Sequence, residues 1–264
     1  MSRRGAILLS FDVEEFDLPM EYGQEISTEA QLETGKKGLD AIMPFLSNPA
    51  VPATLFTTAF FATHFPGEMK ALAATHEIAS HTFHHSSFCN SDLLASRIAL
   101  EGITGTEVRG LRMPRMQKVD VAEVLKAGYS YDSSINPTII PGRYNNRHLP
   151  RTIYGERGLL RIPASVSPVL RLPLFWLGFK NYPYALFRQL AIQTLKKDGY
   201  LCLYFHPWEF TDLQRYRLPA YIKRYNGDAL VKRLTRLTKD LAPHGRFMTT
   251  QQYLESLPIN SSTR

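Results

Sequence analysis

The sequence predicts an α/β protein, a distorted (β/α) barrel of seven or eight parallel strands in a single domain. Two observations support this fold class. Short apolar runs alternate with longer amphipathic runs along the chain, which is the order of strands and helices around a parallel sheet. The chain has 264 residues, of which 44% are hydrophobic, enough to build one large barrel. We therefore expect one domain over residues 1–264, with a Pro/Arg-rich excursion at about 134–180.

The strand and helix units follow one another from the N-terminus. Residues 6–13 form an apolar run without polar alternation, as in a strand buried on both faces. The helix predicted at 28–47 ends before Asn48-Pro49, and Gly128 and Gly199 end two later helices. Further strands are expected at 51–57, 77–80, 107–113, 129–133, 159–163, 200–205 and 246–249. Further helices are expected at 64–74, 91–103, 119–127, 184–198, 228–241 and 250–257.

Reactive side chains stand at the carboxyl ends of several of these strands: Asp12, Glu14, His81, Arg112, Asp132 and His206. The active sites of (β/α) barrels are assembled at this end of the strands. Two or three polar residues could stand there by chance. A full set of carboxylates, histidines and an arginine favours a shared active site.

A histidine pair lies in the stretch Glu77–Phe88. His81 and His85 are four residues apart, which places two imidazoles on one side of a helical turn or turn-like loop. Two imidazole nitrogens can bind one divalent metal ion when a carboxylate supplies a further ligand. The carboxylate-rich stretch Ser10–Asp17 is the obvious source of that ligand. The alternative is that both histidines lie on a solvated turn.

Five short motifs resemble those of a known family. They are Phe11-Asp12-Val13-Glu14, His81-Thr82-Phe83-His84-His85, Arg112-Met113-Pro114, Tyr131-Asp132-Ser133-Ser134 and Tyr204-Phe205-His206-Pro207-Trp208-Glu209. In this order they resemble the motifs of the polysaccharide deacetylases, carbohydrate esterase family 4, over about residues 6–257. The first and last motifs look most like the bacterial branch associated with exopolysaccharide and exosortase loci.

The resemblance implies a metal-dependent hydrolase that removes N-acetyl or O-acetyl groups from a polysaccharide or a lipid-linked sugar. It implies a divalent ion, zinc in the first place and cobalt or nickel as alternatives, held by Glu14, His81 and His85. It also implies Asp12 as the catalytic base, His206 as the catalytic acid and Arg112 as the residue that orients the base.

The chain departs from the family pattern at three places. The family's usual Asp-Asp pair is replaced in this chain by Asp12-Val13-Glu14. Glu15, directly after it, offers a competing carboxylate. Arg115 stands where the family has an aromatic residue. The tryptophan expected after Asp132 is absent, since Asn136 and Pro137 stand there.

Three further residues complete the expected chemistry. Asp132 is expected to hold the His206 imidazolium in place. Arg115 is a candidate substrate-binding residue whose backbone N–H could stabilise an oxyanion, since the neighbouring proline has no N–H. Trp208 is the second candidate substrate-binding residue, and the alternative is a packing role in the core.

The net charge is +7, with much of it in residues 143–188 and 223–239. A solubilising surface explains this charge. Attraction to an anionic glycan or membrane face is the alternative, and nucleic acid is disfavoured because no binding motif is present.

Features of localisation favour the cytoplasm. The N-terminus lacks the apolar segment of a secretory signal, and the most apolar run, 170–179, is too short to span a bilayer. The two cysteines, Cys89 and Cys202, favour a reduced compartment without a disulfide. Peripheral contact with the inner membrane remains open.

Two other functions remain open from the residues alone. An amidohydrolase of small cyclic amides or ureides would use the same groups. A glycan-binding pseudoenzyme would keep the fold but lose turnover through its altered first motif.

Overall fold

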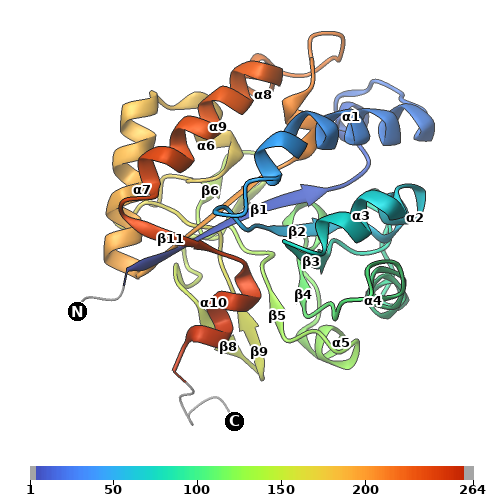
Figure 1. Cartoon of the computed structure of the whole chain (residues 1–264), viewed down its shortest axis with the longest axis horizontal. Helices are drawn as coiled ribbons and strands as arrows, with labels where there is room; N and C mark the ends of the chain where they lie inside the picture. The colour runs from blue at the N-terminus through green and yellow to red at the C-terminus, as the bar shows by residue number, and fades with distance from the viewer. Residues whose placement is uncertain (1–3, 259–264) are drawn as a thin grey trace.

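The computed structural model describes residues 4–258 and contains one curled, mixed sheet with helices packed around it (Figure 1). The sheet has the strand order β10-β1-β2-β3-β4-β5-β9-β8, and β11 also pairs with β1. The predicted distorted (β/α) barrel in a single domain is confirmed. The outermost ends of the predicted domain, residues 1–3 and 259–264, lie outside the described residues.

The strands of the main sheet are β1 (Gly5–Val13), β2 (Thr54–Thr57), β3 (Glu77–Ser80), β4 (Gly110–Leu111), β5 (Tyr131–Asp132), β8 (Tyr154–Glu156), β9 (Leu159–Arg161), β10 (Tyr200–Phe205) and β11 (Gly245–Met248). Their pairings are parallel as predicted, except that β8 runs antiparallel to β9. The predicted strands at 107–113 and 129–133 are wrong in length, because only two residues of each enter a ladder.

Strand β1 pairs with three other strands of the sheet. It pairs with β10 along one side, from Ala6↔Tyr200 to Phe11↔Phe205. Along its other side it pairs first with β11 at residues 5–8 and then with β2 at residues 10–13. Hydrogen bonding on both sides fixes the end of β1, and with it the backbone that carries Asp12 and Glu14.

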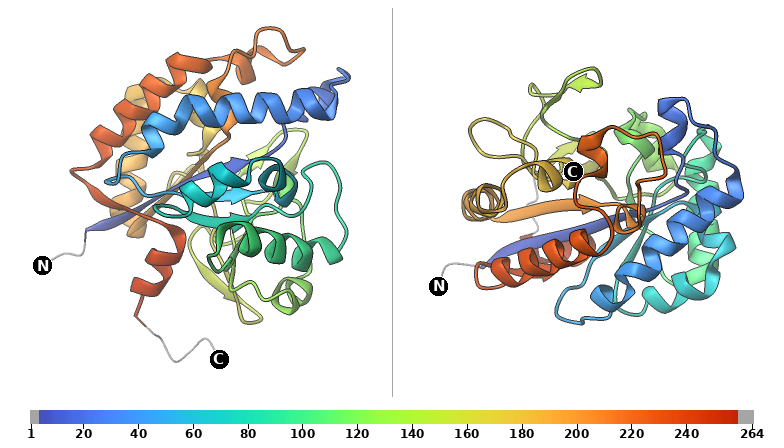
Figure 2. Two further views of the ribbon diagram at one scale, coloured as in Figure 1. Left: turned by 45° about the vertical axis from the view of Figure 1, so that its right-hand side comes forward. Right: turned by 90° about the horizontal axis from the view of Figure 1, so that it is seen from above.

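The helices lie outside the sheet (Figure 2). They are α1 (Thr28–Leu46), α2 (Ala59–His64), α3 (Pro66–Leu72), α4 (Ser91–Thr104), α5 (Val121–Lys126), α6 (Trp176–Asn181), α7 (Tyr184–Asp198), α8 (Ala220–Lys223), α9 (Gly227–Leu241) and α10 (Thr250–Ser256). The helix predicted at 64–74 corresponds to α3, and α2 directly before it was not predicted. The break between these two helices falls at Phe65, because a residue before proline avoids the helical conformation.

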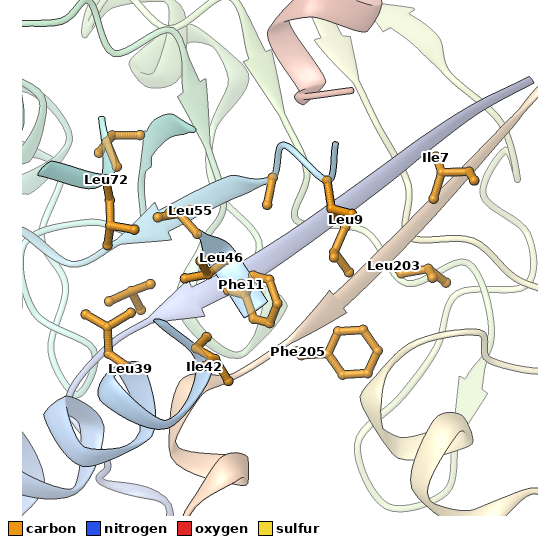
Figure 3. Close-up of a cluster of buried hydrophobic side chains, with 14 of the residues drawn as sticks. Ile7, Leu9, Phe11, Leu39, Ile42, Leu46, Leu55, Leu72, Leu203 and Phe205 are labelled. Atoms are coloured by element: carbon orange, nitrogen blue, oxygen red, sulfur yellow. The ribbon is translucent and has the colours of Figure 1, made fainter. Parts of the chain in front are cut away.

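The main core lies between the sheet and helix α1. Figure 3 shows Phe11 of β1 close to the α1 side chains Ile42 and Leu46, and Ile7 and Leu9 of the same cluster farther along the strand. Helix α1 also lies against the backbone that carries the candidate site. A Cβ on Gly35 would stand 2.5 Å from Glu14 O, and one on Gly38 would stand 2.1 Å from Pro207 O. Only glycine permits such close contacts, so α1 positions both segments.

The excursion at 134–180 is divided between the sheet and its edge. Strand β9 joins the sheet beside β5. The backbone N–H of Ser165 donates to Cys202 O of β10, which links the segment after β9 to the other end of the sheet. Strands β6 (Ile139–Ile140) and β7 (Tyr144–Asn145) form a separate hairpin. Within residues 4–258, no helix is long and apolar enough to cross a membrane.

Candidate metal and acid–base site

Three ligand atoms converge at the carboxyl ends of β1 and β3. Glu14 Oε2 lies 3.0 Å from His81 Nε2 and 3.1 Å from His85 Nε2. Glu14, His81 and His85 form a group whose ligand atoms lie within 4.8 Å of one another. One carboxylate oxygen and two imidazole nitrogens are a common donor set for zinc and related ions.

The surroundings of these three residues fit a metal ion. Glu14 Oε2 is buried and accepts no hydrogen bond from any residue in the described part of the chain. The other ring nitrogen of each histidine is occupied: His81 Nδ1 lies 2.7 Å from Arg112 O, and His85 Nδ1 lies 2.8 Å from Asp17 Oδ1. These contacts leave the two Nε2 atoms to face the carboxylate, which is how outer hydrogen bonds orient metal ligands.

The histidine pair lies on an irregular turn rather than a helix. Thr82, directly after His81, has a φ of 64°, and its side chain donates to His84 O. The two imidazole rings consequently stack with centroids 5.6 Å apart. His84 points elsewhere and packs against Phe60.

The neighbouring acidic residues take other partners. Glu15 accepts from Thr58 Oγ1 at 2.5 Å and from the backbone N–H of His85, so it does not compete for the ligand position of Glu14. Asp17 is buried, and its contacts with His85 and Arg115 hold its pKa below the usual range despite a burial effect in the opposite direction. Asp17 therefore acts as an anionic partner of His85.

Charge stabilises the ionised form of Glu14. Burial alone would raise its pKa, but His85, His81 and His206 outweigh this effect and hold the pKa well below its usual value. Burial alone would lower the pKa of His85, because it disfavours the charged ring, but Glu14 and Asp17 together raise this pKa to about 9. The site thus supplies an anionic oxygen beside two imidazoles.

A third contact to Glu14 comes from a residue that the sequence analysis proposed for substrate binding. Trp208 Nε1 donates to Glu14 Oε1 at 2.9 Å. The indole is buried and stacks on the His206 ring with centroids 4.8 Å apart. Trp208 therefore positions a carboxylate and an imidazole, and it also lines the pocket described below.

Asp12 and Arg112 form a buried ion pair beside the ligands. Arg112 Nη1 lies 2.5 Å from Asp12 Oδ1 and also donates to Ser10 Oγ. The other nitrogens of Arg112 donate to the carbonyl and the hydroxyl of Ser133. One oxygen of Asp12 is therefore fixed, while its Oδ2 lies 3.8 Å from His206 Nε2.

Glu209, and not Asp132, holds the His206 ring. Glu209 Oε1 lies 3.0 Å from His206 Nδ1 and accepts the His206 backbone N–H at 2.9 Å. Its other oxygen lies 3.3 Å from Lys180 Nζ, and both Lys180 and Glu209 are completely buried. Burial lowers the pKa of His206, but Glu209, Glu14 and Asp12 outweigh it and raise the pKa above its ordinary value.

The predicted contact between Asp132 and His206 is wrong. The Asp132 carboxylate accepts from the hydroxyl and backbone N–H of Ser134, and it pairs with Arg161 at 3.4 Å. The reason is topological: β5, which ends in Asp132, lies five strands from β10, which His206 follows, whereas Glu209 lies one turn after His206. Asp132 therefore organises the start of the excursion.

One pocket opens over this floor. It is lined by Asp12, Glu14, His81, His85, His206, Trp208 and further residues of η1 (Leu18–Tyr22), η2 (Pro114–Met116), the β6–β7 hairpin, α6 and α8. Trp176 forms part of the wall and meets the His206 ring edge-on, with the ring centroids 5.4 Å apart.

Arg115 lies in the pocket wall but is already paired. Its side chain contacts Asp17 at 2.7 Å and Glu21 at 2.6 Å, and its backbone has a φ of 55°. Glu21 also pairs with Arg143 of the hairpin at 2.6 Å. The inner rim is thus a neutralised network, which weakens the expectation that these arginines attract an anionic substrate.

Two important residues were not predicted from the sequence as part of the site. Glu209 carried a signal, because a glutamate three residues after a strand-end residue matches a capping box. Lys180 carried none, since it is one basic residue of a Pro/Arg-rich stretch and reaches the site only through α6.

Two family models match successive parts of this chain. Residues 25–131 match the family model described as "Polysaccharide deacetylase", and residues 133–255 match a "Domain of unknown function (DUF3473)". The first range includes His81, His85, Arg112 and Arg115, and the second includes His206 and Glu209. A search of curated proteins found no match.

Solved structures share the fold at low sequence identity. A candidate polysaccharide deacetylase from Mycobacterium smegmatis has a TM-score of 0.64 at 17% identity, covering 97% of this chain and 90% of that one. A probable polysaccharide deacetylase from Pseudomonas aeruginosa PAO1 has a TM-score of 0.67 at 14% identity, covering 97% and 92%. Puue allantoinase has a TM-score of 0.65 at 14% identity, with the same coverage. The chain therefore has the fold of these hydrolases, and its residues 25–131 match the polysaccharide deacetylase model.

Proposed function

We propose that this chain is a metal-dependent hydrolase that removes N-acetyl groups from a polysaccharide or lipid-linked sugar, with O-acetyl groups as a second possible target. One observation carries the proposal: a buried Glu14 oxygen lies 3.0 and 3.1 Å from two histidine nitrogens, beside Asp12 and His206 on one pocket floor. The deacetylase match over residues 25–131 supports the same class of reaction.

Glu14, His81 and His85 would hold the ion, with zinc first and cobalt or nickel as alternatives. When bound, such an ion supplies Lewis acidity, which polarises a carbonyl and lowers the pKa of water. All three ligand residues line the pocket, so an ion held there would be accessible to the substrate.

Amide hydrolysis forms a bond between a water oxygen and the acyl carbon, breaks the C–N bond and returns a proton to the amine. Asp12 is suited to accept the water proton, because Arg112 holds Oδ1 and leaves Oδ2 facing His206. His206 is suited to donate through Nε2, because Glu209 fixes its Nδ1 side and favours the protonated ring. Base and acid thus face the same space.

The pocket walls suit a sugar ring. Trp176 and Tyr144 are aromatic, and Asn136 contributes a polar group. Asn136 Nδ2 donates to the hydroxyls of Tyr144 and Tyr204, which ties this wall to β10. An aromatic face with a few fixed polar groups is typical of small-molecule sites.

The test measures metal content and acetate release together. His81→Ala should abolish stoichiometric binding of zinc, measured by calorimetry on metal-depleted protein. Asp12→Asn should keep the ion but lose at least about a hundredfold in acetate release from an acetylated chitooligosaccharide, because it removes the base and no ligand. His84→Ala is the control and should change neither readout, since His84 packs against Phe60 outside the site.

Full zinc affinity in His81→Ala would overturn the ligand assignment. Loss of the ion in Asp12→Asn together with its retention in Glu14→Gln would mean that the two carboxylates exchange roles. Ring opening of a cyclic ureide without acetate release would favour the amidohydrolase alternative. Glycan binding with neither bound ion nor turnover would favour a pseudoenzyme.

A further inference from the structure

Large apolar side chains are exposed on the segments that surround the pocket mouth. Val169 and Leu170 are 83% and 73% exposed at the tip of the loop before α6. Met20 on η1, Ile139 on the hairpin, Tyr221 on α8 and Tyr225 directly after it are also exposed. Within residues 4–258, the other exposed large hydrophobic residues are Leu94, Ile98, Leu125 and Leu186 on the outer helices.

Hydrogen bonds and an ion pair join these segments into a ring. Tyr22 of η1 meets Tyr221 of α8, with hydroxyl oxygens 3.3 Å apart. Asn181, at the end of α6, donates to Tyr221 O at 3.0 Å. This connects η1, α8 and α6 on one side of the mouth, where all three also line the pocket.

The other side of the ring is closed in the same way. Arg171 donates to Pro137 O and Leu149 O, and Thr138 donates to Arg171 O at 2.6 Å, so the Val169–Leu170 tip lies beside the hairpin. Arg143 of the hairpin pairs with Glu21 of η1. Figure 2 (right) shows the yellow-green hairpin extending away from the sheet. The exposed apolar residues therefore encircle one opening.

The charges around the mouth are sorted by position. In the pocket wall, Arg115 and Arg143 are neutralised by Asp17 and Glu21. On the ring itself, four cations have no carboxylate of residues 4–258 within ion-pair distance: Arg147, Arg171, Lys223 and Arg224. The substrate space is thus balanced, while the outward surface is basic and apolar.

We propose that this ring, defined by Met20, Ile139, Val169, Leu170, Tyr221 and Tyr225 with the cations Arg147, Lys223 and Arg224, docks the protein on an anionic lipid bilayer. Apolar side chains that enter the interface and cations that attract anionic lipids are the two components of peripheral membrane binding. Docking in this orientation presents the pocket to sugars attached to lipids. The inference goes beyond the proposed reaction, because membrane binding requires no turnover.

The experiment is sedimentation with sucrose-loaded vesicles of phosphatidylcholine containing about a third phosphatidylglycerol. The wild-type chain should bind these vesicles, bind phosphatidylcholine alone much more weakly, and lose affinity as salt rises. Val169→Ser with Leu170→Ser should lower the affinity at least about tenfold. Leu94→Ser with Ile98→Ser is the matched control on α4, with two exposed apolar residues far from the mouth, and should change nothing.

The charge component has its own pair of variants. Arg147→Gln with Arg224→Gln should lower affinity by about five-fold per charge. Arg109→Gln with Lys126→Gln removes two exposed cations that pair with carboxylates elsewhere and should have little effect. All these positions are at the surface, so circular dichroism should be unchanged.

Failure of the wild-type chain to bind anionic vesicles would overturn the proposal. Equal losses in the ring and α4 variants would do the same. If light scattering instead finds a dimer that Val169→Ser with Leu170→Ser disrupts, and vesicles are not bound, the ring joins two copies of the chain. Acetate release from a soluble oligosaccharide should be unaffected in the ring variants, so failure of the reaction and failure of docking are distinguishable.

Discussion

Two buried cation–carboxylate pairs flank the candidate site and differ in how well they are satisfied. Arg112 and Asp12 pair between β4 and β1, and Lys180 and Glu209 pair between α6 and η3 (Pro207–Phe210). All four residues are at most 2% exposed, so water can compensate little for a missing contact. Removing one partner of a pair at this depth strongly destabilises the folded protein.

The guanidinium group of Arg112 makes four hydrogen bonds. It donates to Asp12, Ser10 and both oxygens of Ser133, and it lies 4.0 Å from the centroid of the Phe56 ring. Burial lowers the pKa of Arg112, but Asp12 outweighs burial and raises it. A guanidinium in this environment remains charged and immobile.

Lys180 is less well satisfied. Its Nζ and Glu209 Oε2 are 3.3 Å apart, but neither atom makes a hydrogen bond within the described part of the chain. Burial lowers the pKa of Lys180 by more than Glu209 raises it. The Arg112 pair therefore fixes the position of the base. The Lys180 pair beneath the acid is the weaker of the two and is more easily perturbed by mutation or by pH.

The largest expected effect is on the well-satisfied pair. Arg112→Met should lower the free energy of unfolding by about 3–5 kcal/mol, because it leaves Asp12 charged and buried without its partner. Urea unfolding followed by circular dichroism measures this. Arg109→Met, which removes an exposed and paired arginine, should cost less than about 1 kcal/mol. Equal losses in both variants would remove the special status of the Arg112 pair.

A smaller loss is expected at the weak pair. Lys180→Met should lower the free energy of unfolding by about 1–3 kcal/mol, because Nζ has no hydrogen bond to lose but Glu209 keeps its buried charge. Adding Glu209→Gln should recover at least half of that loss, since it removes the uncompensated charge. Adding Asp12→Asn to Arg112→Met should recover less, because Ser10 and Ser133 still lack their donor. The reverse order of recovery would contradict the comparison.

The weak pair should also respond to alkaline pH. Since the folded-state pKa of Lys180 lies below its ordinary value of 10.5, the unfolded chain binds more protons between the two values. The cost of burying the Lys180 charge is therefore complete below the folded-state pKa and is relieved as pH rises toward 10.5. The stability difference between wild type and Lys180→Met should change in this window and be constant below it. A constant difference throughout would mean that Lys180 does not titrate on its own.

The smallest effect is a shift in the pH dependence of turnover. Glu209→Gln removes the charge that favours protonated His206, so the pKa of His206 should fall. Because the acid must carry a proton, activity is lost as pH rises through that pKa, and the alkaline limb of kcat should move to lower pH. Glu156→Gln, at an exposed carboxylate outside the pocket, is the control. An unmoved alkaline limb would limit Glu209 to a structural role.

Much of the fold followed from local pattern. The helix ends at Gly199 and at the Asn48-Pro49 step, and the apolar runs of β1 and β10, are set by backbone conformation and by burial on both faces. The errors arose where pattern was weakest. The short ladders of β4 and β5, the antiparallel β8 and the break at Phe65 depend on neighbours that the sequence does not reveal.

By itself, the sequence determined which reactive residues stand at strand ends and how close neighbours such as His81 and His85 are presented. Strand register and a four-residue turn are local properties, so spacing carries that information. Only the tertiary structure decided which distant side chains meet. Glu209 instead of Asp132 holds His206, Trp208 holds Glu14, and Lys180 reaches Glu209 across 29 residues of chain. These contacts depend on how α6 and η3 pack against β10 and α1, and packing is a property of the whole core.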